Sequence, residues 1–188
     1  WPAARIGWIW NPVRILARGV VAVKTCNGLV AIILAMGLLV SSLATADVSG
    51  TTAPDFTLKS RSGENIRLED LRGEVIMLNF WASWCGPCRQ EMPHMDAIEE
   101  EFRDYGFRVL AVNVDQNRDD AKRFLESVPV DFAILWDHDS TVSELYDVQA
   151  MPTTVMIDRN GQARHVHHGY QPGYEDDYRT QIRELIRE

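Results

Sequence analysis

Cysteine is scarce in this sequence: its 188 residues include three, at positions 26, 85 and 88. A structural zinc site needs about four ligands, and the sequence offers no second Cys-x-x-Cys pair to complete one. Secreted scaffolds that depend on disulfides carry far more cysteines. The close spacing of Cys85 and Cys88 therefore favours redox chemistry over a structural disulfide or half of a zinc site.

Acidic residues are absent from the first 46 positions, which contain four basic ones. An apolar stretch at 28–40 follows, and the segment ends in small residues with an A-x-A pattern at 44–46. This order predicts an export signal peptide, cleaved after Ala46. The alternative is an uncleaved membrane anchor over residues 22–43, preceded by an extension. Both place the rest of the chain in an extracytoplasmic compartment such as a periplasm.

Basic residues are few after position 46: this part of the chain contains 15 basic and 27 acidic residues, and its formal net charge is −12. Nucleic acid is therefore not expected as a partner, because phosphate backbones bind basic surfaces. Internal repeats and low-complexity tracts are also lacking, so the remaining length suits one modest domain. We expect residues 47–53 to form a polar linker and residues 54–188 to form that domain.

The cysteine pair follows a continuous apolar run, Val75–Trp81, which predicts a buried parallel strand leading into a helix. A cysteine at a helix start faces unpaired N–H groups, which stabilise its thiolate. We therefore expect Cys85 to be the nucleophile and Cys88, one turn on, to resolve the mixed disulfide. Pro87 suits the first helical turn, and Gly86 leaves the outer sulfur accessible.

Glu91 lies in the middle of the apolar stripe of the helix that follows. Four apolar residues share its face at 3.6-residue spacing: Met95, Ile98, Phe102 and Tyr105. Cys88 stands one turn before it, so a buried Glu91 with a raised pKa could accept and return the proton of Cys88. The alternative is that Pro93 shifts the helical phase and leaves Glu91 solvated.

The rest of the chain alternates strands with helices. A hairpin is expected from residues 56–59 and 65–68. Later strands are expected at 107–114, 132–136, 155–157 and 163–168, and helices at 118–127, at 140–146 with Ser140 as N-cap, and at 173–187. This order predicts an α/β fold with a central mixed sheet flanked by helices.

Three histidines fall on one expected strand, at positions 165, 167 and 168. His165 and His167 share a face, so a divalent metal could bind there. We favour the simpler interpretation, the polar side of an exposed strand, because no acidic or cysteine ligand is adjacent. His94 is expected at the surface.

Residues 80–88 resemble the active site of the thioredoxin superfamily. Three further matches narrow the resemblance to the exported TlpA/ResA-like thiol-disulfide oxidoreductases of the redoxin group: Glu91-Met92-Pro93, the strand at 109–115 and the turn Met151-Pro152-Thr153-Thr154. The likeness covers roughly residues 53–187. It implies a thioredoxin-like fold with an N-terminal hairpin and a central helix-strand insertion at 117–147.

The resemblance also implies a role for each matching residue. Cys85 would be the attacking thiol, Cys88 the resolving thiol and Glu91 the acidic residue near it. Pro152 would be the family's cis-proline, and Met151 before it would face the disulfide and pair with substrate backbone. Trp84 would pack beside the cysteines. The residues implied to bind substrate are Trp84, Gly86, Pro87, Met151 and Pro152.

Asn79 occupies the position at which cytosolic thioredoxins carry a buried Asp. Because an amide cannot replace that carboxylate as a proton carrier, Glu91 becomes more necessary in this role. The implied activity is reduction of disulfides in exported proteins, with an apocytochrome c as one substrate. Electrons would come from a membrane dithiol protein, and no cofactor or metal is expected. Because the dipeptide between the cysteines helps set redox poise, the direction of the reaction stays open.

Two other functions stay open as well. A thiol peroxidase of the peroxiredoxin type would carry a Pro and a Thr or Ser at set spacing before its cysteine, and residues 79–84 lack that Pro. A non-catalytic metal-binding module would use Cys85, Cys88 and a histidine. Peroxide consumption and metal content would separate these functions from disulfide exchange.

Overall fold

The computed structural model describes residues 50–188. The predicted signal peptide or membrane anchor at 1–46, with its span at 22–43, lies outside the described residues, as does the start of the predicted linker 47–53. Within the described part of the chain, no helix has both the length and the apolar character needed to cross a bilayer.

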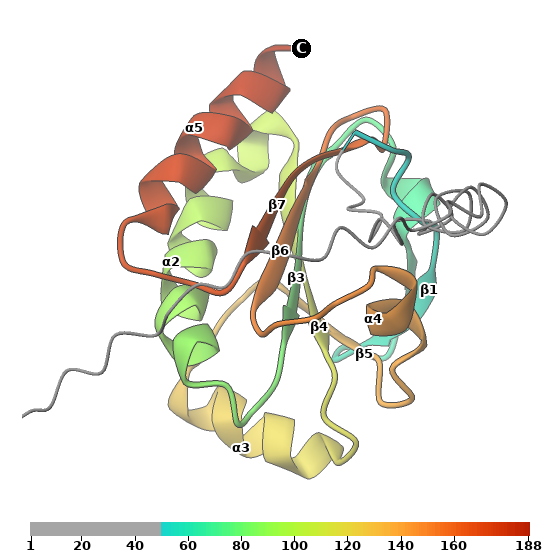
Figure 1. Ribbon diagram of the computed structural model, residues 1–188, viewed down its shortest axis with the longest axis vertical. Helices are drawn as coiled ribbons and strands as arrows, with labels where there is room; N and C mark the ends of the chain where they lie inside the picture. Colours follow the sequence, from blue (N-terminus) through green and yellow to red (C-terminus); the bar gives the residue numbers. More distant parts are fainter. Residues whose placement is uncertain (1–49) are drawn as a thin grey trace, which may run out of the picture. The chain divides into compact units, whose positions relative to one another are not determined.

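The described strands form a single mixed sheet in the order β2-β1-β5-β4-β3-β6-β7 (Figure 1). In chain order the elements are β1 (Thr57–Ser60), β2 (Asn65–Arg67), the 3₁₀ turn η1 (Leu68–Leu71), β3 (Val75–Trp81), α2 (Gly86–Phe102), the 3₁₀ turn η2 (Arg103–Tyr105), β4 (Phe107–Asn113), α3 (Arg118–Ser127), β5 (Ala133–Trp136), α4 (Thr141–Leu145), β6 (Thr153–Ile157), β7 (Ala163–His168) and α5 (Tyr174–Arg187). The predicted mixed sheet with its N-terminal hairpin is confirmed.

Strand β3 is the centre of the sheet. It pairs parallel with β4 and antiparallel with β6, and each of its residues is buried. Because successive side chains point to opposite faces, Met77 and Trp81 pack under α2, α3 and α5, whereas Leu78 and Phe80 pack under η1 and α4. Both faces of β3 are thus covered, which explains why its sequence is continuously apolar rather than alternating.

The N-terminus of α4 is capped by Asp137 and not, as predicted, by Ser140. Ser140 has left-handed backbone geometry, with φ of 60°, and its side chain makes no capping hydrogen bond. The Asp137 carboxylate instead accepts from the N–H groups of Val142 at 3.0 Å and Ser143 at 2.8 Å. A buried acceptor ahead of the helix therefore satisfies the unpaired donors of its first turn.

The structure also differs from the predictions at Tyr105 and at the described part of the linker. Tyr105, assigned to the apolar stripe of α2, lies in η2 beyond the helix and is 63% exposed. The described part of the predicted linker hydrogen-bonds to the domain: Gly50 N–H donates to Ala163 O at 2.6 Å, and Ala53 N–H donates to Gly161 O at 2.9 Å. Ala53 is also buried, because it packs in the core beneath η1 and α4.

Candidate active site

Cys85 and Cys88 form a disulfide at the start of α2, directly after the loop that leaves β3. Cys85 is the N-cap residue, and its sulfur accepts a hydrogen bond from Cys88 N–H at 3.1 Å. Gly86 and Pro87 occupy the exposed first turn. The predicted strand-to-helix position of both sulfurs is confirmed, and the helix start offers the N–H groups that stabilise a thiolate.

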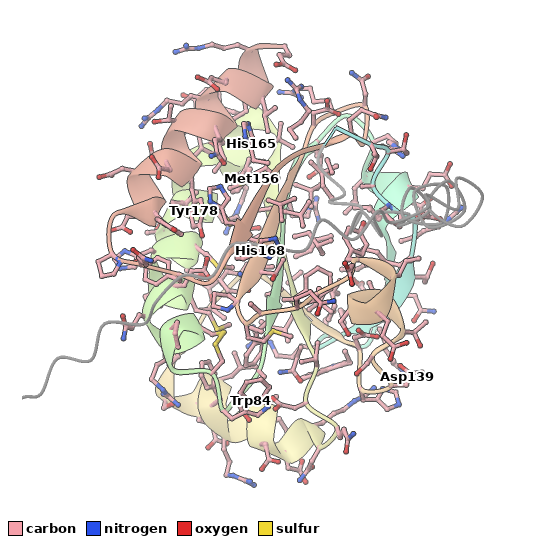
Figure 2. The ribbon with its side chains drawn as sticks, in the orientation of Figure 1. Trp84, Asp139, Met156, His165, His168 and Tyr178 are labelled. Atoms are coloured by element: carbon pink, nitrogen blue, oxygen red, sulfur yellow. A yellow bond between two sulfur atoms is a disulfide. The ribbon has the colours of Figure 1, made fainter. Side chains whose placement is uncertain are left out.

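Access to the two cysteines is unequal. Cys88 has no exposed surface and Cys85 is only 4% exposed. Cys85, the outer cysteine, is therefore less accessible to solvent than the neighbouring Gly86 led us to expect. Trp84 was expected to pack beside the pair, but it is 71% exposed and projects from the end of the domain where α2 begins (Figure 2). Trp84 also lines a shallow surface hollow with Arg89, Arg123 and Phe124.

The bond between Met151 and Pro152 is cis, as the resemblance implied. Pro152 is buried and Met151 is half-buried, with its side chain against both halves of the core. The turn is held by two hydrogen bonds: Thr153 Oγ1 donates to Ala150 O and Gly169 N–H donates to Pro152 O, each at 2.7 Å.

Glu91 is fully buried, as the helical spacing predicted. Its Oε2 accepts from Asn79 Nδ2 at 2.9 Å, and its Oε1 accepts from Thr154 Oγ1 at 3.2 Å and from Tyr178 Oη at 2.7 Å. Burial raises the pKa of Glu91 to about 7, although the three hydrogen bonds lower it. Pro93 lies on the exposed side of α2 and does not displace Glu91 from the buried face.

The Asn79 side chain links the carboxylate to the sheet. Its Nδ2 also donates to Thr154 Oγ1, at 2.8 Å, so β3 and β6 hold Glu91 together. Asn79 Oδ1 is buried without a hydrogen-bond partner among the described residues. An uncharged amide at this position leaves Glu91 as the buried acid of this network.

Sequence reasoning gave no role to three residues that build the site. Thr154 and Tyr178 hold Glu91, and Asp115 holds the loop before Cys85 by accepting from Ser83 N–H at 2.8 Å and from Ser83 Oγ at 3.0 Å. Their positions could have pointed to two of them: Thr154 lies two positions after Pro152, and Asp115 directly follows an apolar strand. Tyr178 carried no such signal, because a tyrosine in the apolar stripe of a helix is usually a core residue.

The histidines do not assemble a metal site in the described residues, where no group of three or more His, Cys, Asp or Glu side chains could hold an ion. The expected exposed face of β7 is half-buried instead. His167 Nε2 lies 3.0 Å from Gln181 Oε1 of α5 and packs against the Tyr178 ring. Burial also lowers the pKa of His165. His94 is exposed, as expected, beside the Tyr170 ring.

A Cys-x-x-Cys disulfide at the helix after the central strand of a mixed sheet defines the class: this is a thioredoxin-like thiol-disulfide oxidoreductase. The chain belongs to the AhpC/TSA family, whose model matches residues 49–166. It is 39% identical over 122 residues to the thiol-disulfide oxidoreductase ResA of Geobacillus kaustophilus, a match that covers 65% of this chain and 70% of that protein. Identity to ResA of Bacillus subtilis is 38% over 113 residues, covering 60% and 63%.

Solved structures agree with this assignment. A candidate thiol:disulfide interchange protein DsbE from Chlorobium tepidum is similar with a TM-score of 0.71 and 40% identity, over 73% of this chain and 97% of that one. A candidate protein disulfide isomerase from Bacteroides thetaiotaomicron is similar with a TM-score of 0.69 and 30% identity, over 74% and 91%. The predicted thioredoxin-like fold and the resemblance to ResA-like oxidoreductases are confirmed.

Proposed function

We propose that this chain reduces disulfides in exported proteins, outside the cytoplasm, through the Cys85/Cys88 dithiol. One observation carries the mechanism: a fully buried Glu91, one turn beyond Cys88, whose pKa of about 7 lets it hold or release a proton at neutral pH. The extracytoplasmic location rests on the predicted signal or anchor segment at 1–46.

The reaction is a two-step exchange. Cys85 thiolate attacks one sulfur of the substrate disulfide, forms a mixed disulfide and releases the other substrate sulfur as a thiolate. Cys88 then gives its proton to Glu91, attacks the Cys85 sulfur and releases the second substrate thiolate, which takes up a proton. The substrate gains two electrons, and the protein leaves with the Cys85–Cys88 disulfide.

The surface around Cys85 would bind the substrate chain. Trp84 offers an exposed aromatic ring directly before Cys85 in the chain, and Met151 with the cis-Pro152 would face the disulfide and pair with the substrate backbone. The exposed Gly86 and Pro87 present little bulk above the sulfurs: a Cβ built on Gly86 would meet no atom within 4 Å. An extended segment carrying a cysteine therefore has room to approach.

The cycle needs a partner on each side. A membrane dithiol protein would return two electrons and two protons to the Cys85–Cys88 disulfide, since no cofactor is needed for thiol exchange. An apocytochrome c with a disulfide at its haem-attachment cysteines is the specific substrate we propose to test first.

The reduction potential of the Cys85/Cys88 pair tests the direction. We would equilibrate the protein, with Cys26 replaced by Ser, in thiol buffers of defined potential and measure the oxidised fraction. A value near that of thioredoxin, about −270 mV, is expected of an electron donor. A value near about −120 mV would make the protein an oxidant and overturn the proposed direction.

The same preparation separates the competing functions. Reduced protein that consumes hydrogen peroxide at a rate above that of free thiols would favour a thiol peroxidase. Stoichiometric metal after purification, lost in a Cys88→Ser variant, would favour a metal-binding module. We expect neither result.

A further inference from the structure

The closing helix α5 contributes one polar group to the buried site, the hydroxyl of Tyr178 (Figure 2). It donates to Glu91 Oε1 at 2.7 Å, the shortest of the three hydrogen bonds that this carboxylate accepts. The Tyr178 side chain has no exposed surface. Because phenylalanine would fill the same apolar space, the hydroxyl matters for the carboxylate it contacts rather than for packing.

The three donors differ in what they can do when Glu91 gains a proton. Asn79 Nδ2 only donates, so the carboxyl group cannot direct a proton towards it. A hydroxyl both donates and accepts, and the hydroxyls of Tyr178 and Thr154 can therefore reverse their hydrogen bonds to Oε1. The proton of neutral Glu91 consequently belongs on Oε1, the oxygen that Tyr178 contacts most closely.

Neighbouring rings fix the position of the Tyr178 side chain. His167 of β7 meets it edge-on, with ring centroids 5.0 Å apart, and Tyr174 lies one turn earlier on α5 at 6.4 Å. Since the ring is also fully buried, its hydroxyl marks a fixed point for Oε1 between α2 and α5.

The surroundings contribute little competing charge. Tyr178 on α5 is the titratable group in contact with the carboxylate. Cys88 stands one turn before Glu91 on α2, His167 of β7 packs against the Tyr178 ring, and Tyr170 in the loop before α5 interacts electrostatically with Glu91. Strands β3 and β6 contribute the neutral Asn79 and Thr154. Burial, followed by the hydrogen bond to Glu175, raises the pKa of Tyr170 to about 12, so it stays protonated at neutral pH.

We propose that Tyr178 is a positioning residue for the thiol-disulfide reaction, whose hydroxyl fixes Glu91 Oε1 in both protonation states while Cys88 loses and regains its proton. This inference rests on the proposed role of Glu91. Among the hydrogen bonds that lower the pKa of Glu91, the one from Tyr178 has the largest effect. Removing the hydroxyl should therefore make Glu91 hold its proton to higher pH.

The test compares Tyr178→Phe with Tyr174→Phe, which deletes a neighbouring hydroxyl that does not contact Glu91. The Glu91 carboxyl carbon is followed by ¹³C NMR against pH in the oxidised protein. Reduced protein, with Cys26 replaced by Ser, is also mixed with an aromatic disulfide that releases a coloured thiolate at each step. The first release reports attack by Cys85 and the second reports resolution by Cys88.

For Tyr178→Phe we expect both the Glu91 midpoint and the pH profile of the second release to move upward by about one unit, with Tyr174→Phe unchanged. A Tyr178→Phe midpoint equal to that of the wild type would overturn the inference. If Tyr178→Phe does not fold, the wild-type protein supplies the test. The ¹³C chemical shift of the hydroxyl-bearing carbon of Tyr178 should then change with pH at the Glu91 midpoint. A chemical shift that does not change with pH would overturn the inference.

Glu91→Gln separates this inference from the function beneath it. If that variant leaves the second release unchanged, the proposed role of Glu91 fails and the role of Tyr178 fails with it. If Glu91→Gln changes the second release but Tyr178→Phe does not, the proposed function stands and the inference about Tyr178 is wrong.

Discussion

Two opposing effects set the proton affinity of Glu91. Burial disfavours the carboxylate and raises its pKa, while hydrogen bonds from Tyr178, Asn79 and Thr154 favour the charged form and lower it. The net pKa of about 7 means that both forms are populated near neutral pH. A group that exchanges a proton with a thiol needs this balance.

Glu91→Gln should slow the resolving step without disturbing attack by Cys85. Glutamine keeps the shape of the side chain but cannot accept the Cys88 proton, so we expect the second thiolate release at pH 7 to fall about 100-fold. The rate should recover at high pH, where Cys88 ionises unaided. Stopped-flow measurement from pH 5 to 10 would show this, and an unchanged second phase would remove Glu91 from the mechanism.

Helical spacing made the burial of Glu91 predictable from sequence, because residues along one helix keep a fixed relation to each other. The partners of Glu91 were not predictable in the same way. Tyr178 is 87 positions away, and it meets Glu91 only because α5 docks against α2. Trp84 shows the converse: its motif is local, but whether it packs or projects depends on the folded surface around it.

Among the elements, α4 shows how a short helix depends on its cap. Its five residues, Thr141–Leu145, are too few to be stable without help from outside the helix. Asp137 provides that help from a fully buried position at the end of β5. The sequence suggested Ser140 because serine is a common N-cap, yet the left-handed geometry at Ser140 moves that role three residues back.

Asp137→Ala should destabilise the domain by about 2 kcal/mol, because two hydrogen bonds to helical N–H groups are lost in a buried place. Asp139→Ala is the matched control: it removes a nearby exposed carboxylate that does not cap α4. Urea unfolding of both variants would check the difference. Equal midpoints for the two would contradict the capping role, and Ser140→Ala should cost less than Asp137→Ala.

At the level of the whole molecule, sequence order predicted a mixed sheet but not every strand neighbour. Strands β6 and β7 pair across a short turn, so their hairpin is local and could be foreseen. Strand β1 instead pairs with β5, more than 70 positions away. That contact depends on how the insertion α3-β5-α4 returns to the sheet, which hydrophobic pattern alone does not specify.

The buried carboxyl of Glu91 should also make the unfolding free energy of the whole domain depend on pH. Its folded-state pKa, about 7, lies above the unfolded value of 4.5, so the folded state binds more protons between these values. Its stabilising contribution is therefore complete below pH 4.5 and is lost as the pH rises through 7. The pKa difference corresponds to about 3 kcal/mol.

We expect the unfolding free energy of the oxidised protein to fall by up to about 3 kcal/mol from pH 5 to pH 8 relative to Glu91→Gln, in which this titration is absent. The comparison uses the slope of the unfolding free energy against pH in each protein. The slope does not include the constant free-energy cost of placing the glutamine amide of Glu91→Gln among three hydrogen-bond donors. The comparison also cancels opposing contributions such as that of His165, whose pKa is lowered by burial. Parallel slopes for the two proteins, measured by denaturant unfolding at each pH, would mean that Glu91 is already ionised in the folded domain at pH 5.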